Sequence, residues 1–248
     1  PESGMVIYTS KYQIRNLGLA KLLENHFNLP CYVGNDTRSL ALAEHFFGES
    51  RDCMDSILVS VHQGAGSGII TKGQVFLGHN RNVGEIGHIQ VEPLGKRCHC
   101  GNFGCLETIA SNEAIVDKVK ELISRGHLSS LQEKHITIQE VCKAAMAGDE
   151  LARSVIENVG EHLGRAIAIT VNLFNPQKVL IAGEITAAEE ILIPAIRRCV
   201  EHQSLPSFHR GLPIVKARFQ NQPTIGGFAL VKRSLLEGDL LQIIMEQK

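Results

Sequence analysis

The stretch "GEIGHIQVEPLGKRCHCGNFGCLE", residues 84–107, constrains this chain most, because it gathers three cysteines on one short turn that contains glycine. The spacing C-x-C-x4-C brings three thiolates within reach of a single tetrahedral ion. Zinc takes four sulfur or nitrogen ligands, so Cys98, Cys100 and Cys105 require one more. A complete set of four leaves no open coordination position, which predicts a structural zinc site.

Two histidines compete for the fourth position. His99 lies between Cys98 and Cys100, so its side chain is expected to point away from the metal that both neighbours bind. His88 arrives from the preceding segment and is the predicted fourth ligand. Free thiols or a different metal remain the alternatives. A zinc ribbon that reads DNA is disfavoured, because the sequence offers no second cysteine pair of this kind.

The composition is that of a globular protein: 248 residues, 44% hydrophobic and 21% charged, with a formal net charge of -1. A near-neutral charge disfavours a nucleic-acid-binding surface on these residues. Clustered cysteines without a secretory signal favour metal ligation and a cytoplasmic location. The other four cysteines have apolar neighbours and are expected to be buried: Cys31, Cys53, Cys142 and Cys199.

Strand and helix patterns alternate along the chain, which predicts an α/β fold. Strands are expected over residues 29–36, 56–61, 178–183 and 213–219. Residues 62–70 are expected to form a glycine turn that leads into a further strand, and residues 71–78 to continue this hairpin, with the bend at Lys72 and Gly73. Helices are expected over residues 37–48, 111–126, 137–148, 149–174 and 187–203, and within residues 224–247. Ser111 is the expected cap of the second of these helices, and Thr137 and Glu140 have the spacing of a capping box at the start of the third. Within the long helix, Gly160 and Gly164 fall on one face and predict close packing against a neighbouring helix.

Several polar side chains accompany the cysteine cluster. Glu85 and Glu107 flank His88, and Asn35 and Asp36 end a predicted strand. Carboxylates, an amide and an imidazole that converge on one cleft would match several hydroxyls of a sugar. From spacing alone, the alternative that the glutamates are solvated or cap helices stays open.

These segments resemble the ROK family, which contains bacterial sugar kinases and sugar-responsive transcriptional repressors. The run "GEIGH" matches the E-x-x-G-H segment of the family, and "CHCGNFGCLE" matches its cysteine motif. The run "NDTRSLALAE" matches its N-D-x4-A-x2-E helix start. The resemblance covers essentially the whole chain.

The resemblance implies an actin-like (ribonuclease H-like) two-lobed α/β fold, with the N-terminal part missing from this chain. Residues 1–36 would be the remainder of the N-terminal lobe, with a C-terminal helix over 235–248 packing on it. Residues 37–234 would form the zinc-containing lobe, which binds sugar and mediates oligomerisation.

The resemblance also implies roles for individual residues. Asn35 and Asp36 would contact the distal hydroxyls of a sugar, Asp36 being the position of the general base in the kinases. Glu85, His88 and Glu107 would bind hydroxyls near the anomeric end, and His88 would also bind zinc.

The chain departs from the kinases where they bind nucleotide. Their G-T-G-x-G loop is replaced by "HQGAGSG", with His62 and Gln63 at its first two positions, and Glu184 brings a negative charge after a later strand. We therefore expect no enzyme activity. His62, Gln63 and Gly64 are instead expected to meet the phosphate of an effector.

The expected function is the effector-binding and oligomerisation region of a sugar-responsive bacterial repressor of N-acetylglucosamine utilisation genes. Its effector would be a hexose derivative such as N-acetylglucosamine 6-phosphate. The resemblance implies that operator DNA would be bound only through the missing N-terminal winged helix-turn-helix, and that the protein would be a homodimer or homotetramer. The alternatives are an ATP-dependent ROK sugar kinase, and a glucose-responsive repressor captured by a phosphotransferase-system permease component.

Overall fold

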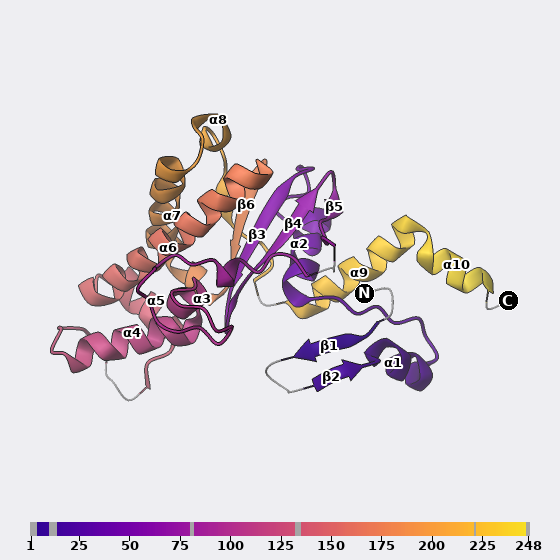
Figure 1. Ribbon diagram of the computed structural model, residues 1–248, viewed down its shortest axis with the longest axis horizontal. Helices are drawn as coiled ribbons and strands as arrows, with labels where there is room; N and C mark the ends of the chain where they lie inside the picture. Colours follow the sequence, from indigo (N-terminus) through magenta and orange to yellow (C-terminus); the bar gives the residue numbers. More distant parts are fainter. Residues whose placement is uncertain (1–3, 10–13, 80–81, 132–134, 221, 247–248) are drawn as a thin grey trace.

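The computed structural model describes residues 4–9, 14–79, 82–131, 135–220 and 222–246. Its centre is a five-stranded sheet of order β5-β4-β3-β6-β7, and a two-stranded sheet, β1-β2, lies apart from it (Figure 1). The strands are β1 (Val6–Thr9), β2 (Ile14–Leu17), β3 (Ser56–Val61), β4 (Ala65–Thr71), β5 (Gln74–Val75), β6 (Lys178–Ala182) and β7 (Ile214–Lys216). The α-helices are α1 (Leu19–Phe27), α2 (Asp36–Phe47), α3 (Glu107–Ala110), α4 (Asn112–Ser124), α5 (Ile138–Met146), α6 (Glu150–Phe174), α7 (Glu189–Gln203), α8 (Pro206–His209), α9 (Pro223–Glu237) and α10 (Asp239–Glu246). The described ranges also contain the 3-10 helices η1 (Ile86–His88) and η3 (Glu184–Ala188).

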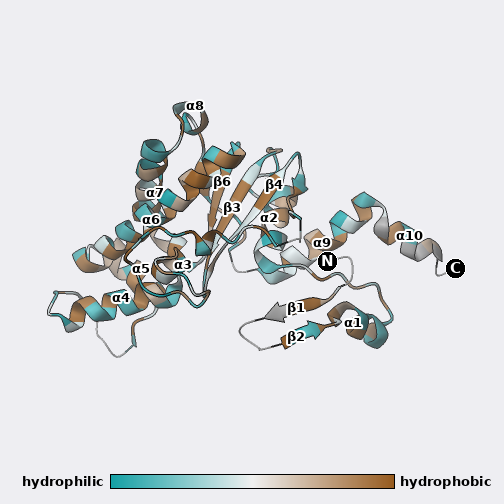
Figure 2. Cartoon of the chain, in the orientation of Figure 1, coloured by the Kyte–Doolittle hydropathy of each residue, from teal (hydrophilic) through white to brown (hydrophobic). Residues whose placement is uncertain are grey.

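The central sheet is mixed. Strand β3 pairs antiparallel with β4 and parallel with β6, and β6 pairs parallel with β7. Strands β3, β4, β6 and β7 confirm four of the predicted strands. Strands β4 and β5 form the predicted hairpin, whose bend at Lys72 and Gly73 has positive φ angles. Strand β3 is buried along its whole length, which agrees with the apolar residues 57–59 at its centre (Figure 2).

Both faces of this sheet are covered by helices, and successive residues of β3 face opposite sides. Ile57 and Val59 belong to the large core formed with α4, α5, α6 and α7, whereas Leu58 packs with α2. Helix α9 packs in turn against α2, where Ala229 joins a smaller cluster. The α/β prediction is therefore confirmed. The parallel strands β3 and β6 end on the same side of the sheet, between the two layers of helices.

Helices α6 and α7 pack closely where α6 carries glycine. A Cβ added at Gly160 would lie 2.7 Å from the Cβ of Ala195, and one at Gly164 would lie 2.5 Å from the Cβ of Cys199. The predicted role of these two glycines in close packing is confirmed. Cys199 is only partly buried, as is Cys31, whereas Cys53 and Cys142 are buried as expected.

Two expectations about the ends of the chain need correction. Residues 29–35 form no strand, because they pair with no neighbour in the described part of the chain and lead directly into α2. The predicted helix over 235–248 is interrupted at Gly238, whose φ of 89° ends α9 before α10 begins at Asp239. The division into lobes stays a prediction, and its proposed boundary at Asp36 coincides with the first residue of α2.

The predicted helix starts are confirmed by their caps. The Ser111 side chain accepts a hydrogen bond from Ala114 N, and Thr137 and Glu140 form a complete capping box. No helix in the described ranges is both long and apolar enough to cross a membrane.

Asp149, the N-cap of α6, is expected to make stability depend on pH. Burial opposes its ionisation, but hydrogen bonds from Ala152 N, Ser130 and Ser129 lower its pKa to about 2. A carboxyl with a lowered folded-state pKa stabilises the fold above its unfolded value, and this contribution is lost as pH falls towards the folded value. We expect Asp149→Asn to flatten the decline in thermal unfolding temperature between about pH 4 and pH 2. An unchanged slope would contradict this assignment.

Candidate functional site

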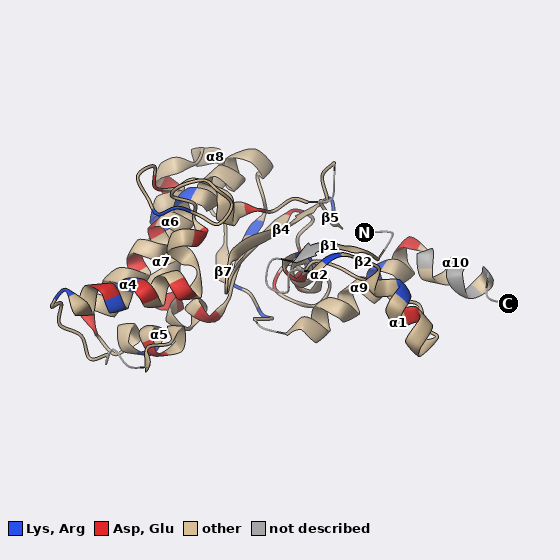
Figure 3. Ribbon diagram, turned by 60° about the horizontal axis from the view of Figure 1, so that its bottom comes forward, with Lys and Arg blue, Asp and Glu red and all other residues tan. Residues whose placement is uncertain are grey.

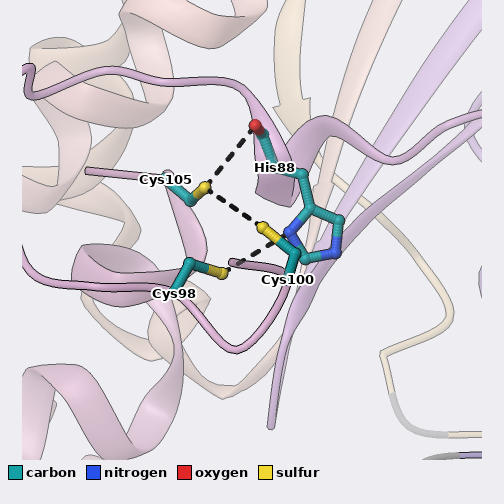
Figure 4. A group of neighbouring side chains, drawn as sticks. All are labelled: His88, Cys98, Cys100 and Cys105. Atoms are coloured by element: carbon teal, nitrogen blue, oxygen red, sulfur yellow. Dashed lines mark hydrogen bonds between the residues drawn. The ribbon is translucent and has the colours of Figure 1, made fainter. Parts of the chain in front are cut away.

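Four potential metal ligands meet beside η1. One ligand atom each of His88, Cys98, Cys100 and Cys105 can be chosen so that all lie within 4.8 Å of one another (Figure 4). The Sγ atoms of Cys100 and Cys105 are 3.7 Å apart, and Cys98 Sγ is 3.7 Å from His88 Nδ1. For bonds of about 2.3 Å to sulfur, the edges of a tetrahedron measure about 3.7 Å. These four residues therefore could hold a tetrahedral metal ion.

Backbone geometry brings these ligands together. Gly104, with a φ of 66°, lets the turn fold onto Glu92, because an added Cβ would lie 1.6 Å from Glu92 O. Burial and the neighbouring sulfurs raise the pKa of Cys105 to about 12. A thiolate at this buried position therefore needs a cation beside it.

His99 does not turn fully away from this cluster. Its Nδ1 is 3.9 Å from Cys98 Sγ, and its ring meets the ring of His88 edge-on at 5.2 Å between centroids. The same Nδ1 lies 3.0 Å from Glu107 Oε1. Cys98, His99 and Glu107 thus form a second group with metal-binding spacing. The group of four ligands contains His88 and not His99, whose side chain lies against Glu107 at the start of α3.

Three separate segments that carry predicted sugar ligands converge on the first residues of β4. Near Gly64, Ala65 N donates a hydrogen bond to Glu107 Oε2 at 3.2 Å. Gly84 is hydrogen-bonded to Ser67, whose backbone N and Oγ both donate to Gly84 O. Thr37, the second residue of α2, lies over Gly66. The start of β4 therefore brings Asp36, Glu85 and Glu107 to one region of the molecule.

At the start of α2, Asn35 and Asp36 are exposed. Asn35 Oδ1 caps the helix by accepting from Arg38 N at 3.1 Å, and Asp36 Oδ1 accepts from Thr37 N at 2.7 Å. Both exposed side chains therefore lie at the positive end of the helix dipole.

Arg38 is a site residue that sequence reasoning missed. Burial lowers its pKa, while the nearby carboxylates of Glu85 and Asp36 act in the opposite direction. Its Nη1 also donates to Val83 O at 3.2 Å, which ties α2 to the segment that carries Glu85. The only sequence signal for this role was its position two residues after Asp36.

His62, at the start of the turn between β3 and β4, contacts Glu184, which follows β6. Its Nδ1 lies 2.6 Å from Glu184 Oε2, and Asn112 Nδ2 donates to the same oxygen at 2.9 Å. Burial opposes the ionisation of Glu184, yet hydrogen bonds from Asn112, from its own backbone and from His62 lower its pKa. Glu184 is therefore an ionised group at the carboxyl ends of β3 and β6, and the turn at Gln63 and Gly64 lies beside it.

The outer surface of α4 and the metal-binding loop is charged with both signs. On α4, Glu121 pairs with Lys118 and with Arg125 just beyond the helix end, and both acidic and basic residues lie along this helix (Figure 3). A cavity of about 400 Å³ lies between this loop, α4 and α6, lined by Lys96, His162 and others. Its lining includes Thr108 and Ile109, which directly follow Glu107 in α3.

Comparison with known proteins gives the context for this geometry. The family model described as "ROK family" matches residues 1–234. The chain belongs to the ROK family.

Among relatives, an N-acetylglucosamine repressor from Escherichia coli O6:H1 is 56% identical over 246 residues, which cover 99% of this chain and 61% of that protein. The DNA-binding transcriptional repressor Mlc of Escherichia coli K12 is 40% identical, over 97% of this chain and 59% of its own length. A crystal structure of a ROK family transcriptional regulator, a homologue of E. coli Mlc, superposes with a TM-score of 0.95 at 48% identity, covering 99% of this chain and 62% of that one. The chain thus spans about three fifths of the length of these relatives.

Within this ROK protein, the predicted residues separate into two groups. Asn35, Asp36, Glu85 and Glu107 are grouped around the start of β4, next to the cluster that contains His88. His62 is instead paired with Glu184. Asn112 was not assigned to the site from sequence, because its partner Glu184 lies far away along the chain. His99 was not assigned either, because its partner Glu107 lies beyond the other end of the cysteine turn.

Proposed function

We propose that this chain is the effector-binding and oligomerisation region of a bacterial transcriptional repressor of N-acetylglucosamine utilisation genes. Its effector is N-acetylglucosamine 6-phosphate. The observation that carries the proposal is the convergence of three polar segments on β4 beside a Cys3His cluster. The repressor relatives, and one named for N-acetylglucosamine, support the same choice.

The metal proposed for the cluster is zinc, bound by His88, Cys98, Cys100 and Cys105. Separations of 3.7 Å between ligand atoms fit its tetrahedral preference, and three thiolates with an imidazole are its usual donors. Four protein ligands leave no position for a substrate, so the ion would stabilise the turn. His88 would also present its ring edge to the sugar, next to Glu85 and Glu107.

Sugar recognition is assigned to Asn35, Asp36, Glu85, His88 and Glu107. Asn35 can donate from its amide nitrogen, whereas the three carboxylates accept hydrogen bonds from hydroxyls. A phosphate near Asp36 would meet repulsion, and Arg38, close to both Asp36 and Glu85, offers a compensating positive charge. His62, Gln63 and Gly64 are proposed to face the phosphate from the β3–β4 turn.

Effector binding would act through linked equilibria. A ligand that contacts several segments favours the arrangement in which those segments are closest, and so changes the relative positions of lobes or protomers. Operator affinity would then fall through DNA-binding segments attached to the same protein. The homo-oligomer, the operator and the cytoplasmic location belong to this proposal.

The alternative of an ATP-dependent sugar kinase is disfavoured by charge. Glu184 is held ionised at the carboxyl ends of β3 and β6, where it would repel the several negative charges of a nucleotide polyphosphate more strongly than the single phosphate proposed beside His62. We expect calorimetric titration to detect N-acetylglucosamine 6-phosphate binding, with weaker binding of glucose and glucosamine 6-phosphate. A coupled assay for ADP release should give no turnover with N-acetylglucosamine, N-acetylmannosamine or glucose.

The outcomes of these measurements separate the candidate functions. No heat with any sugar phosphate would reject the effector proposal, and steady ADP release would favour the kinase. A preference for glucose, together with capture by the cytosolic part of a sugar permease, would favour the glucose-responsive alternative.

A further inference from the structure

His99 contacts two members of the proposed sugar site. Its Nδ1 is 3.0 Å from Glu107 Oε1, and its ring meets His88 edge-on. The His99 side chain is 65% exposed, whereas that of Glu107 is 18% exposed. A surface side chain on the cysteine turn therefore reaches a carboxylate that is mostly enclosed by the fold.

Both oxygens of Glu107 are engaged, and by different parts of the molecule. Oε1 faces the imidazole on the cysteine turn, and Oε2 accepts a hydrogen bond from Ala65 N at the start of β4. Each carboxylate oxygen can accept more than one hydrogen bond, so both retain capacity for a ligand hydroxyl. The two contacts fix the plane of the carboxylate, which determines the directions from which a hydroxyl can approach.

The turn itself holds the His99 backbone in place. Cys98 N donates to Asn102 O at 2.7 Å, and Gly101 N donates to Cys98 O at 3.0 Å. Since Cys98 and Cys100 are candidate metal ligands on either side, metal binding would restrict the backbone from which the imidazole extends.

We propose that His99 is a positioning residue that orients Glu107 for sugar hydroxyls and so links the metal-binding turn to sugar affinity. The inference rests on the proposed function, since it assigns Glu107 to sugar recognition. It assigns no metal ligation to His99, although Cys98, His99 and Glu107 also have metal-binding spacing.

The test compares His99→Ala and His99→Asn in the metal-loaded chain. We expect His99→Ala to weaken N-acetylglucosamine 6-phosphate binding about twofold to fivefold, the loss expected for one partly exposed ion-pair contact with a carboxylate. An asparagine amide can place an N–H near the position of Nδ1, so His99→Asn should recover most of the affinity. Bound metal, measured by atomic emission, should be unchanged in both variants.

His127→Ala serves as the control, because this histidine is also exposed and lies on the loop after α4. Unaltered sugar affinity in His99→Ala, or equal losses in the Ala and Asn variants, would overturn the inference alone. Loss of metal in His99→Ala would overturn it in favour of direct ligation. If the unchanged chain binds none of the sugars, the proposed function fails and this inference fails with it.

Discussion

Replacing Cys105 by serine is expected to abolish metal binding and to weaken N-acetylglucosamine 6-phosphate binding by more than about 100-fold. Cys105 is fully buried, and its Sγ lies 3.7 Å from Cys100 Sγ. A serine hydroxyl is a poor zinc ligand, and three ligands would not hold the turn against the entropy of the open loop. Since this turn leads directly into Glu107, its loosening should also release that carboxylate and the neighbouring His88.

The measurement pairs metal content with calorimetry on the same preparations. Cys53→Ser is the matched control, because Cys53 is also buried but lies outside the cluster, next to Asp52. It should retain both metal and sugar binding. Removing the metal from the unchanged chain with a chelator should reproduce the Cys105→Ser result. Full sugar affinity after complete metal removal would refute the structural role of the ion.

The second large effect is expected from Gly84→Ala. Gly84 has a φ of 89°, and an added Cβ would lie 2.0 Å from Ser67 O. The backbone cannot retreat easily, because Ser67 N donates to Gly84 O at 2.7 Å. We expect a loss of about 4 kcal/mol in the free energy of unfolding, since strain and a backbone clash add. Displacement of the adjacent Glu85 should also reduce sugar affinity.

Gly126→Ala separates the two contributions to this cost. Gly126 has nearly the same φ, 90°, but an added Cβ would meet nothing within 4 Å. This variant should lose only about 1 kcal/mol, the cost of the left-handed backbone alone. Denaturant unfolding of both variants measures the difference. Equal losses would mean that the contact between Gly84 and Ser67 does not hold this segment in place.

Much of the fold followed from local patterns. The capping box at Thr137 and Glu140, the Ser111 cap and the apolar run of β3 each depend on neighbours in sequence, and each was predicted correctly. The segment over residues 29–36 was not, because a short apolar stretch becomes a strand only if another strand pairs with it.

The candidate site also has one part that local sequence patterns predicted and another that they did not. The spacing of Cys98, Cys100 and Cys105 was sufficient to predict a metal-binding group, because all three lie on one turn. The pairing of His62 with Glu184 joins residues 122 positions apart, and the approach of Arg38 to Val83 joins residues 45 positions apart. No local pattern encodes such contacts.

For this chain, the sequence alone determined the helix boundaries set by caps, the cysteine turn and the resemblance to its family. Only the tertiary structure decided that His99 faces Glu107, that Arg38 lies near Asp36 and Glu85, and that Glu184 engages His62. The physical reason is the separation along the chain between the residues that make each contact. Caps and turns depend on hydrogen bonds between residues a few positions apart, whereas these side-chain contacts exist only once β3, β4 and β6 are paired and their helices packed.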